Sequence, residues 1–207
     1  MDLPQLSSQG IPVRFPDCCL SLSTKLLQIL TNKFSNTTLS GETPTVLSIG
    51  SGSGILEAFL LAQLNNSSSA KFNIEGVEVQ QTSGKEPVNK YLPEQAIYTV
   101  RGTWDVVTRL QEPDVRALMF VYPRQPALVS AHTKAIAEQG LNVEVIVWLG
   151  PMADWQVFES CFIASGEHEH RLFTVAEKMQ GLEAGLDEYE LMVVMRRPDY
   201  NCGKLSQ

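Results

Sequence analysis

The residues best suited to chemistry form a glycine-rich turn in the first third of the chain. The segment Gly50-Ser51-Gly52-Ser53-Gly54 directly follows an apolar run, and a helical pattern comes after it. Glycine suits such a turn because it adopts left-handed backbone and lets a ligand approach without a Cβ in the way. The start of the helix adds free backbone N–H groups. The pattern therefore predicts a ligand-binding turn, and the alternative is a turn that only packs tightly.

A second candidate is Glu78, which stands at the end of the next apolar run. A carboxylate at the tip of a strand can accept hydrogen bonds from both hydroxyls of a ribose, and two charge-assisted bonds fix the orientation of a nucleoside. We interpret Glu78 as a ribose ligand. The alternative is a solvated acid at the end of a strand.

The spacing of the glycines separates two classes of cofactor. Dinucleotide-binding folds prefer G-x-G-x-x-G, but Ile55 stands where the last glycine would fall. The pattern G-x-G-x-G after an apolar strand instead resembles motif I of the class I S-adenosylmethionine-dependent methyltransferases. Glu78 falls where that family places its ribose-binding acid. The resemblance covers residues 45–196, and it implies a Rossmann-like fold and S-adenosyl-L-methionine as the cofactor.

The same resemblance implies further cofactor contacts. Many members carry an acid two positions before the first glycine, where it holds the amino-acid end of the cofactor, but Ser48 stands there in this chain. Because a serine hydroxyl brings no charge, weaker cofactor binding and a displaced acid such as Glu57 both stay open. Thr103 and Trp104 follow the third predicted strand, where the family contacts adenine. Trp104 as a plain core residue is the alternative.

Tyr122 and Arg124 are the candidate catalytic residues. They flank Pro123 after the fourth predicted strand, where the substrate is usually met, and could orient or deprotonate an acceptor or bind a carboxylate. Methyl transfer relies mainly on alignment and on exclusion of water, so a catalytic side chain is not compulsory. The segment departs from the Asn/Asp-Pro-Pro-aromatic signature, which puts exocyclic amines of bases and glutamine amides in doubt as acceptors. The alternative is a turn with a solvated arginine.

The elements that must position these residues alternate between short apolar runs and helical segments. Strands are predicted at residues 45–49, 72–79, 96–100, 116–122 and 143–149, and helices at 20–34, 53–64, 127–139 and 155–164. Two further β-rich runs, 170–177 and 189–196, have a connector too short for a helical crossover, so they should pair antiparallel. We predict an α/β fold with a Rossmann-like seven-stranded, mostly parallel sheet, an antiparallel C-terminal strand pair, and helices on both faces.

Length and composition predict one compact domain. The chain has 207 residues, of which 43% are hydrophobic, enough for a substantial core. We expect residues 1–44 to form an arm and a helix that pack on the core, and residues 45–207 to form the Rossmann-like methyltransferase domain. The chain has neither a secretory start nor an apolar stretch that could span a bilayer, so we expect a cytoplasmic protein, with the nucleus left open. Its four cysteines include no C-x-x-C pair, and we expect no metal site.

Charge guides the expectation about partners. The net charge is −7 and the basic residues are scattered, so the long-range field should not attract a phosphate backbone. Nucleic acid is therefore the minority alternative, with a local basic groove left open. We expect a small-molecule or peptide acceptor and no membrane. The oligomeric state stays open. His132 is expected at the surface of its helix.

Three functional hypotheses follow. The first is a methyltransferase acting on a small molecule or on a protein or peptide side chain. The second is a catalytically inactive methyltransferase-like protein that serves for binding or as a scaffold, suggested by Ser48 and by the segment around Arg124. The third is a nucleotide-cofactor oxidoreductase.

Overall fold

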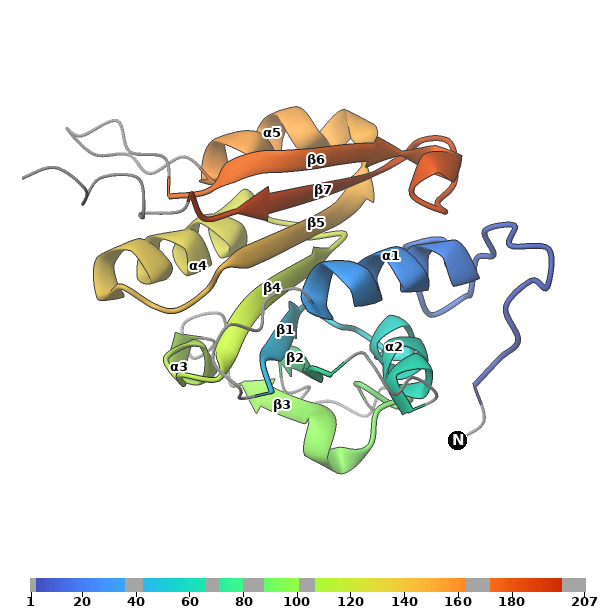
Figure 1. The fold of residues 1–207 in the computed structure, drawn as a ribbon, viewed down its shortest axis with the longest axis horizontal. Helices are drawn as coiled ribbons and strands as arrows, with labels where there is room; N and C mark the ends of the chain where they lie inside the picture. Colours follow the sequence, from blue (N-terminus) through green and yellow to red (C-terminus); the bar gives the residue numbers. More distant parts are fainter. Residues whose placement is uncertain are drawn as a thin grey trace, which may run out of the picture.

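One seven-stranded sheet organises the chain, in the order β3-β2-β1-β4-β5-β7-β6 (Figure 1). The computed structural model describes residues 3–35, 43–65, 71–79, 88–100, 107–162 and 172–198. The strands are β1 (Thr45–Ile49), β2 (Asn73–Val79), β3 (Ile97–Val100), β4 (Val115–Val121), β5 (Val145–Pro151), β6 (Thr174–Gln180) and β7 (Glu190–Arg196). Strands β1 to β5 are parallel, whereas β7 runs antiparallel to both β5 and β6. The predicted sheet, with its antiparallel C-terminal pair, is confirmed.

Helices cover both faces of this sheet, as predicted. The helices are α1 (Thr24–Ser35), α2 (Ile55–Asn65), α3 (Val107–Leu110), α4 (Pro126–Gln139) and α5 (Trp155–Glu159), with 3₁₀ turns η1 (Glu94–Ala96), η2 (Met152–Asp154), η3 (Ser160–Phe162) and η4 (Gly181–Glu183). Figure 1 shows α1 and α2 on one side of the sheet and α4 and α5 on the other. Each side has its own core of buried apolar side chains, because the central strands are buried on both faces.

Several element boundaries differ from the predicted ones. Helix α1 begins four residues later than expected, because Leu22 still pairs with Val13 in an antiparallel bridge and the Ser23 hydroxyl caps the helix by accepting from the Leu26 N–H at 3.1 Å. Helix α5 ends at Glu159, where η3 takes over, and β6 lies at 174–180 instead of 170–177. Helix α3 and the 3₁₀ turns were not predicted.

The N-terminal arm shares the core of the sheet. Leu20, Leu22 and Leu26 lie in the same buried cluster as Val46 and Ile74 from the sheet. The division of the chain at residue 44 stays a prediction. None of the helices in the described ranges is long and apolar enough to cross a membrane.

The strand order places a crevice at the carboxyl ends of β1 and β4. The chain leaves β1 toward β2 and β3 on one side, then returns to β4 on the other side of β1. The connections after β1 and β4 therefore diverge, and such a switch point is where open α/β sheets bind ligands. The glycine turn follows β1, and Tyr122 follows β4.

A close approach between α1 and the connector before β7 yields a stability prediction. Gly185 has φ +74°, and a Cβ there would lie 2.5 Å from Ser23 Oγ and 2.7 Å from the Leu26 nitrogen. Gly140, with φ +63° at the end of α4, has nothing within 4 Å of the same position. Gly140→Ala should therefore cost only the strain of left-handed backbone, about 1–2 kcal/mol.

Gly185→Ala adds a steric clash to that strain, so we expect its free energy of unfolding in urea to fall by about 1–3 kcal/mol more than that of Gly140→Ala. Equal losses in the two variants would show that α1 and the connector do not pack as closely as described.

Candidate functional site

The glycine turn after β1 has the backbone conformation for which glycine is suited. Gly50, Gly52 and Gly54 have φ values of +79°, +59° and +77°. The Gly50 N–H donates to the Val77 carbonyl at 2.9 Å, which ties the turn to β2. A Cβ on Gly50 or Gly52 would meet nothing within 4 Å. These two glycines therefore face open space, and the turn can receive a ligand against its backbone.

Residues 88–92 clamp the turn from its other side. The side chain of Asn89 is fully buried, and its backbone is left-handed at φ +55°. Its N–H donates to the Gly52 carbonyl at 2.7 Å, and its Oδ1 accepts from the Ser51 hydroxyl at 2.6 Å. Asn89 was not predicted as a site residue from the sequence. The one local signal is that asparagine tolerates left-handed backbone, which does not single out this asparagine from others.

Glu78 lies directly against the turn. One oxygen of its carboxylate accepts from the Gly52 N–H at 3.0 Å, and the other accepts from the Val79 N–H at 3.0 Å. The structure thus brings together the two parts of the site that the sequence marks, the acid at the tip of β2 and the glycine turn. Its role as ribose ligand stays a prediction.

Ser48 lies below the turn and does not face solvent. Its side chain is fully buried on β1, and its hydroxyl donates to the Glu57 carboxylate in the first turn of α2. Glu57 is itself buried, and burial raises its pKa from 4.5 to about 7. Ser48, at the position where many methyltransferases carry an acid, and Glu57, the candidate for a displaced acid, therefore form one hydrogen-bonded pair.

A cleft of about 630 Å³ lies over the turn. Its floor includes the glycine turn, Glu57 and Glu78, and its walls come from residues 17–19 of the arm and residues 121–125 after β4. The arm is fixed there because the Lys90 ammonium lies 2.7 Å from the Asp17 carboxylate, and the Ser53 hydroxyl donates to the Asp17 carbonyl at 3.0 Å. The cleft thus joins the candidate cofactor residues to the candidate catalytic ones.

Tyr122 lines the wall of this cleft, and its hydroxyl is hydrogen-bonded within the protein. The hydroxyl donates to the buried Glu190 carboxylate at 2.6 Å, and Glu190 also accepts from the Ser21 N–H at 3.2 Å and from Arg14 at 3.1 Å. Burial and the neighbouring Glu190 raise the pKa of Tyr122 well above its ordinary value. The tyrosine therefore stays protonated near neutral pH, which argues against deprotonation of an acceptor by this group.

Arg124 is exposed and lines the same cleft, and it forms no ion pair with the described residues. Cys18 also lines the cleft, but burial raises the pKa of its thiol to about 12, so it is not a thiolate nucleophile at neutral pH. Thr103 and Trp104 lie outside the described residues. Within the described ranges, no group of three His, Cys, Asp or Glu side chains could hold a metal ion.

His132 is fully buried, so its predicted surface position is wrong. Its Nδ1 lies 2.7 Å from the Leu128 carbonyl of the preceding turn, and its ring packs edge-on against Phe120. Burial lowers its pKa, so the ring is a neutral part of the core. It lies on the inner face of α4 and does not line the cleft.

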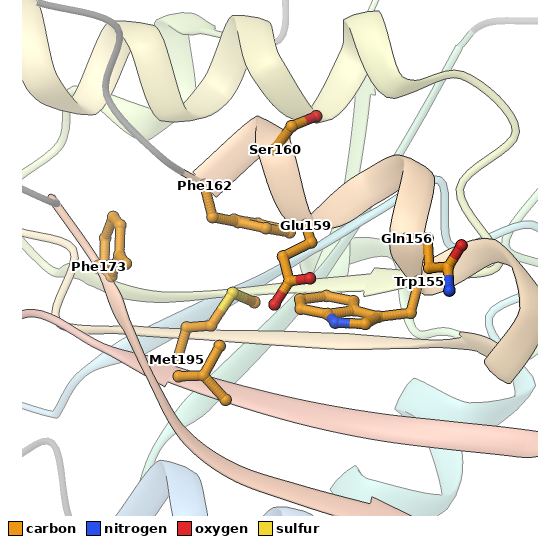
Figure 2. A pocket seen from close by; sticks show the side chains of 8 residues that line it. Trp155, Gln156, Glu159, Ser160, Phe162, Phe173 and Met195 are labelled. Atoms are coloured by element: carbon orange, nitrogen blue, oxygen red, sulfur yellow. The ribbon is translucent and has the colours of Figure 1, made fainter.

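A second hollow of about 450 Å³ shares no lining residue with this cleft. Figure 2 shows it between the end of α5 and strands β6 and β7, with Trp155, Phe162, Phe173 and Met195 around it. Trp155 stacks on Phe162 and meets Trp148 edge-on. These rings belong to the buried core, so they are no aromatic cage.

Similar folds are found among solved structures. A ribosomal protein L11 methylase from Lactobacillus delbrueckii subsp. bulgaricus superposes with a TM-score of 0.51 and 9% identity, over 91% of this chain and 82% of that one. A candidate tRNA (m1A22) methyltransferase from Streptococcus pneumoniae, solved with S-adenosyl-L-methionine, gives 0.52 and 14%, over 85% and 73%. A candidate class I S-adenosylmethionine-dependent methyltransferase from Listeria monocytogenes gives 0.54 and 12%, over 86% and 60%.

The expectation about partners needs correction. Two of these structures are of proteins described as acting on tRNA and on ribosomal protein L11. Proteins with this fold therefore include some that act on macromolecules, and the prediction from net charge that nucleic acid is not a partner was wrong. The expected small-molecule or peptide acceptor is corrected with it, because the two similar proteins are described as acting on macromolecules. Net charge was a poor guide, since it does not describe the local surface that meets an acceptor.

No protein-family profile matches the sequence, and no curated protein matches it. Identities of 9–14% establish a shared fold and no more. The resemblance seen at Gly50-Ser51-Gly52-Ser53-Gly54 and Glu78 is confirmed at that level: the chain has the Rossmann-like fold of the class I S-adenosylmethionine-dependent methyltransferases.

Proposed function

We propose that the protein is an S-adenosyl-L-methionine-dependent methyltransferase. The observation that carries the proposal is the contact between Glu78 and the glycine turn, where a carboxylate at the tip of β2 lies 3.0 Å from the Gly52 N–H at the edge of an open cleft. An acid beside a backbone turn without side chains is suited to a nucleoside whose ribose hydroxyls need acceptors. Dinucleotide-binding folds carry a similar acid, so the preference for S-adenosyl-L-methionine over a dinucleotide comes from the glycine spacing, in which Ile55 stands where their last glycine would fall.

The residues that would hold the cofactor are Gly50, Ser51, Gly52, Gly54 and Glu78, with Ser48 below them. They fit, because the turn presents bare backbone to the cleft and Glu78 supplies two acceptor oxygens. When bound, the cofactor supplies a methyl group on a sulfonium centre. For the adenine we keep Thr103 and Trp104 as contacts, on the resemblance alone.

The chain itself would contribute alignment and exclusion of water. The arm residues 17–19 and the segment after β4 close two sides of the cleft over the glycine turn. Arg124 would bind or orient an anionic part of the acceptor, since it is exposed at the cleft and forms no ion pair with the described residues. Tyr122 would shape this wall as a protonated side chain anchored on Glu190. Macromolecules such as tRNA and ribosomal proteins belong among the acceptors to be assayed, as in the two similar structures.

Calorimetric titration with S-adenosylhomocysteine and with NAD tests the cofactor class. We expect S-adenosylhomocysteine to bind and NAD not to bind. Glu78→Ala should weaken S-adenosylhomocysteine binding by about 1.5–3 kcal/mol, because two charge-assisted hydrogen bonds to the ribose are lost. Glu94→Ala is the matched control, since Glu94 is an exposed acid in η1 outside the cleft.

Unchanged affinity in Glu78→Ala would remove this residue from the site. Binding of NAD alone would favour the oxidoreductase, whereas binding of neither ligand to the wild-type protein would favour the scaffold without catalysis.

Tyr122→Phe tests whether this tyrosine has a structural role. The variant leaves Glu190 buried with one donor fewer, so we expect the free energy of unfolding to fall by about 1.5–3 kcal/mol. Affinity for S-adenosylhomocysteine should stay within about twofold of wild type, since the hydroxyl points to Glu190. Tyr98→Phe is the control, because the Tyr98 hydroxyl has no hydrogen bond with described residues. A loss in Tyr122→Phe no larger than in the control would contradict the anchoring role.

A further inference from the structure

Glu57 is a buried acid whose second oxygen has no partner. Its side chain is 1% exposed, yet the residue lines the cleft over the glycine turn. Oε1 accepts from the Ser48 hydroxyl, whereas Oε2 has no hydrogen bond within the described part of the chain. No described lysine or arginine pairs with it either. An isolated buried carboxylate is costly, and natural proteins pair such groups with a cation or a donor.

The Glu57 carboxylate lies close to the strand position where many class I methyltransferases carry an acid and this chain has Ser48. Ser48 stands on β1 where many methyltransferases carry an acid, and Glu57 reaches the same place from the third residue of α2. The first turn of a helix favours a negative charge, because free N–H groups point toward it. The carboxylate is thus supplied from the helix, with the serine as its hydrogen-bond donor.

Given the proposed function, the geometry points to Glu57 as the counter-ion of the ammonium group at the amino-acid end of the cofactor. An ammonium provides both features that the buried carboxylate lacks, a positive charge and a donor for Oε2. Ser48 acts through Glu57 as a positioning residue, since its hydroxyl holds Oε1, while the buried Oε2 has no partner among the described residues.

The surroundings of Glu57 make this contact dependent on pH. Burial raises its pKa to about 7, the Ser48 hydroxyl and the backbone N–H of Glu57 itself oppose that shift, and the charge of Glu78 on β2 adds to it. From the arm it faces Cys18, whose thiol is neutral because burial raises its pKa to about 12. An ammonium ligand favours the ionised carboxylate, so binding should strengthen as pH rises through 7. The ionised fraction grows about tenfold between pH 6 and pH 8.

The test compares two ligands that differ at the amino-acid end. S-adenosylhomocysteine carries the ammonium, whereas 5′-methylthioadenosine shares the adenosine and the sulfur but lacks the amino-acid end. We expect Glu57→Gln to weaken S-adenosylhomocysteine about tenfold or more at pH 8 and to leave 5′-methylthioadenosine within about twofold. Wild-type affinity for S-adenosylhomocysteine should rise about tenfold from pH 6 to pH 8, and Glu57→Gln should abolish that rise. Glu94→Gln should behave as wild type in both measurements.

Glu57→Gln is expected to fold at pH 8. Because the pKa of Glu57 is higher in the folded than in the unfolded chain, ionisation costs stability as pH rises from 4.5 to about 7, and glutamine has no such cost. Should the variant still fail to fold, Ser48→Ala replaces it: loss of the donor should move the midpoint of the pH profile for S-adenosylhomocysteine upward.

Three results would overturn the inference. The first is an unchanged affinity for S-adenosylhomocysteine in Glu57→Gln. The second is an equal loss for both ligands, which indicates general damage to the cleft. The third is a wild-type protein that binds neither ligand. This third result contradicts the proposed cofactor as well, whereas the first two contradict only the role of Glu57.

Discussion

The candidate site depends on a backbone bend that leaves no room for side chains. A Cβ on Gly54 would lie 2.8 Å from Leu92 Cγ, and one on Gly76 of β2 would lie 2.6 Å from Leu92 Cδ1. The turn, β2 and residues 88–92 can therefore pack together only because both positions are glycine. Since Gly76 keeps β2 this close to the turn, Glu78 two residues further on reaches the Gly52 N–H. The site is thus a consequence of close packing between three backbone segments.

The acids Glu57 and Glu78, which line the cleft, and Glu190, which lies behind Tyr122, have different hydrogen-bond partners. Glu190 is buried and accepts from a tyrosine, an arginine and a backbone N–H, so its charge is fully supported. Glu78 is supported by two backbone N–H groups at the rim. Glu57 accepts from the Ser48 hydroxyl through one oxygen, and its other oxygen has no hydrogen bond within the described residues. The lining acids Asp17, Glu57 and Glu78 outnumber the lining bases Lys90 and Arg124, so the cleft suits a cationic ligand better than a phosphate, which agrees with the proposed sulfonium cofactor.

The parts of the fold and site that could be predicted from the sequence are those that follow from local residue patterns. The glycine turn and Glu78 could be predicted because residue types and their spacing identify them within one strand-turn-helix unit and the strand that follows it. Glu190 could not be found that way, because it meets Ser21 across a separation of 169 residues. The buried position of His132 was missed since its partner is a backbone carbonyl, which no side-chain pattern reveals. The partner expectation was wrong because net charge averages over the whole chain, whereas recognition depends on a local surface.

The antiparallel direction of β7 is what connects the C-terminal hairpin to the cleft. Glu190 begins β7 and pairs with Pro151 at the end of β5, so it lies at the same edge as the carboxyl ends of the parallel strands. A parallel β7 would place its first residue at the opposite edge. From this edge Glu190 holds Tyr122 on one side and Arg14 of the arm on the other. The hairpin thereby positions two walls of the cleft, although none of its own residues lines it.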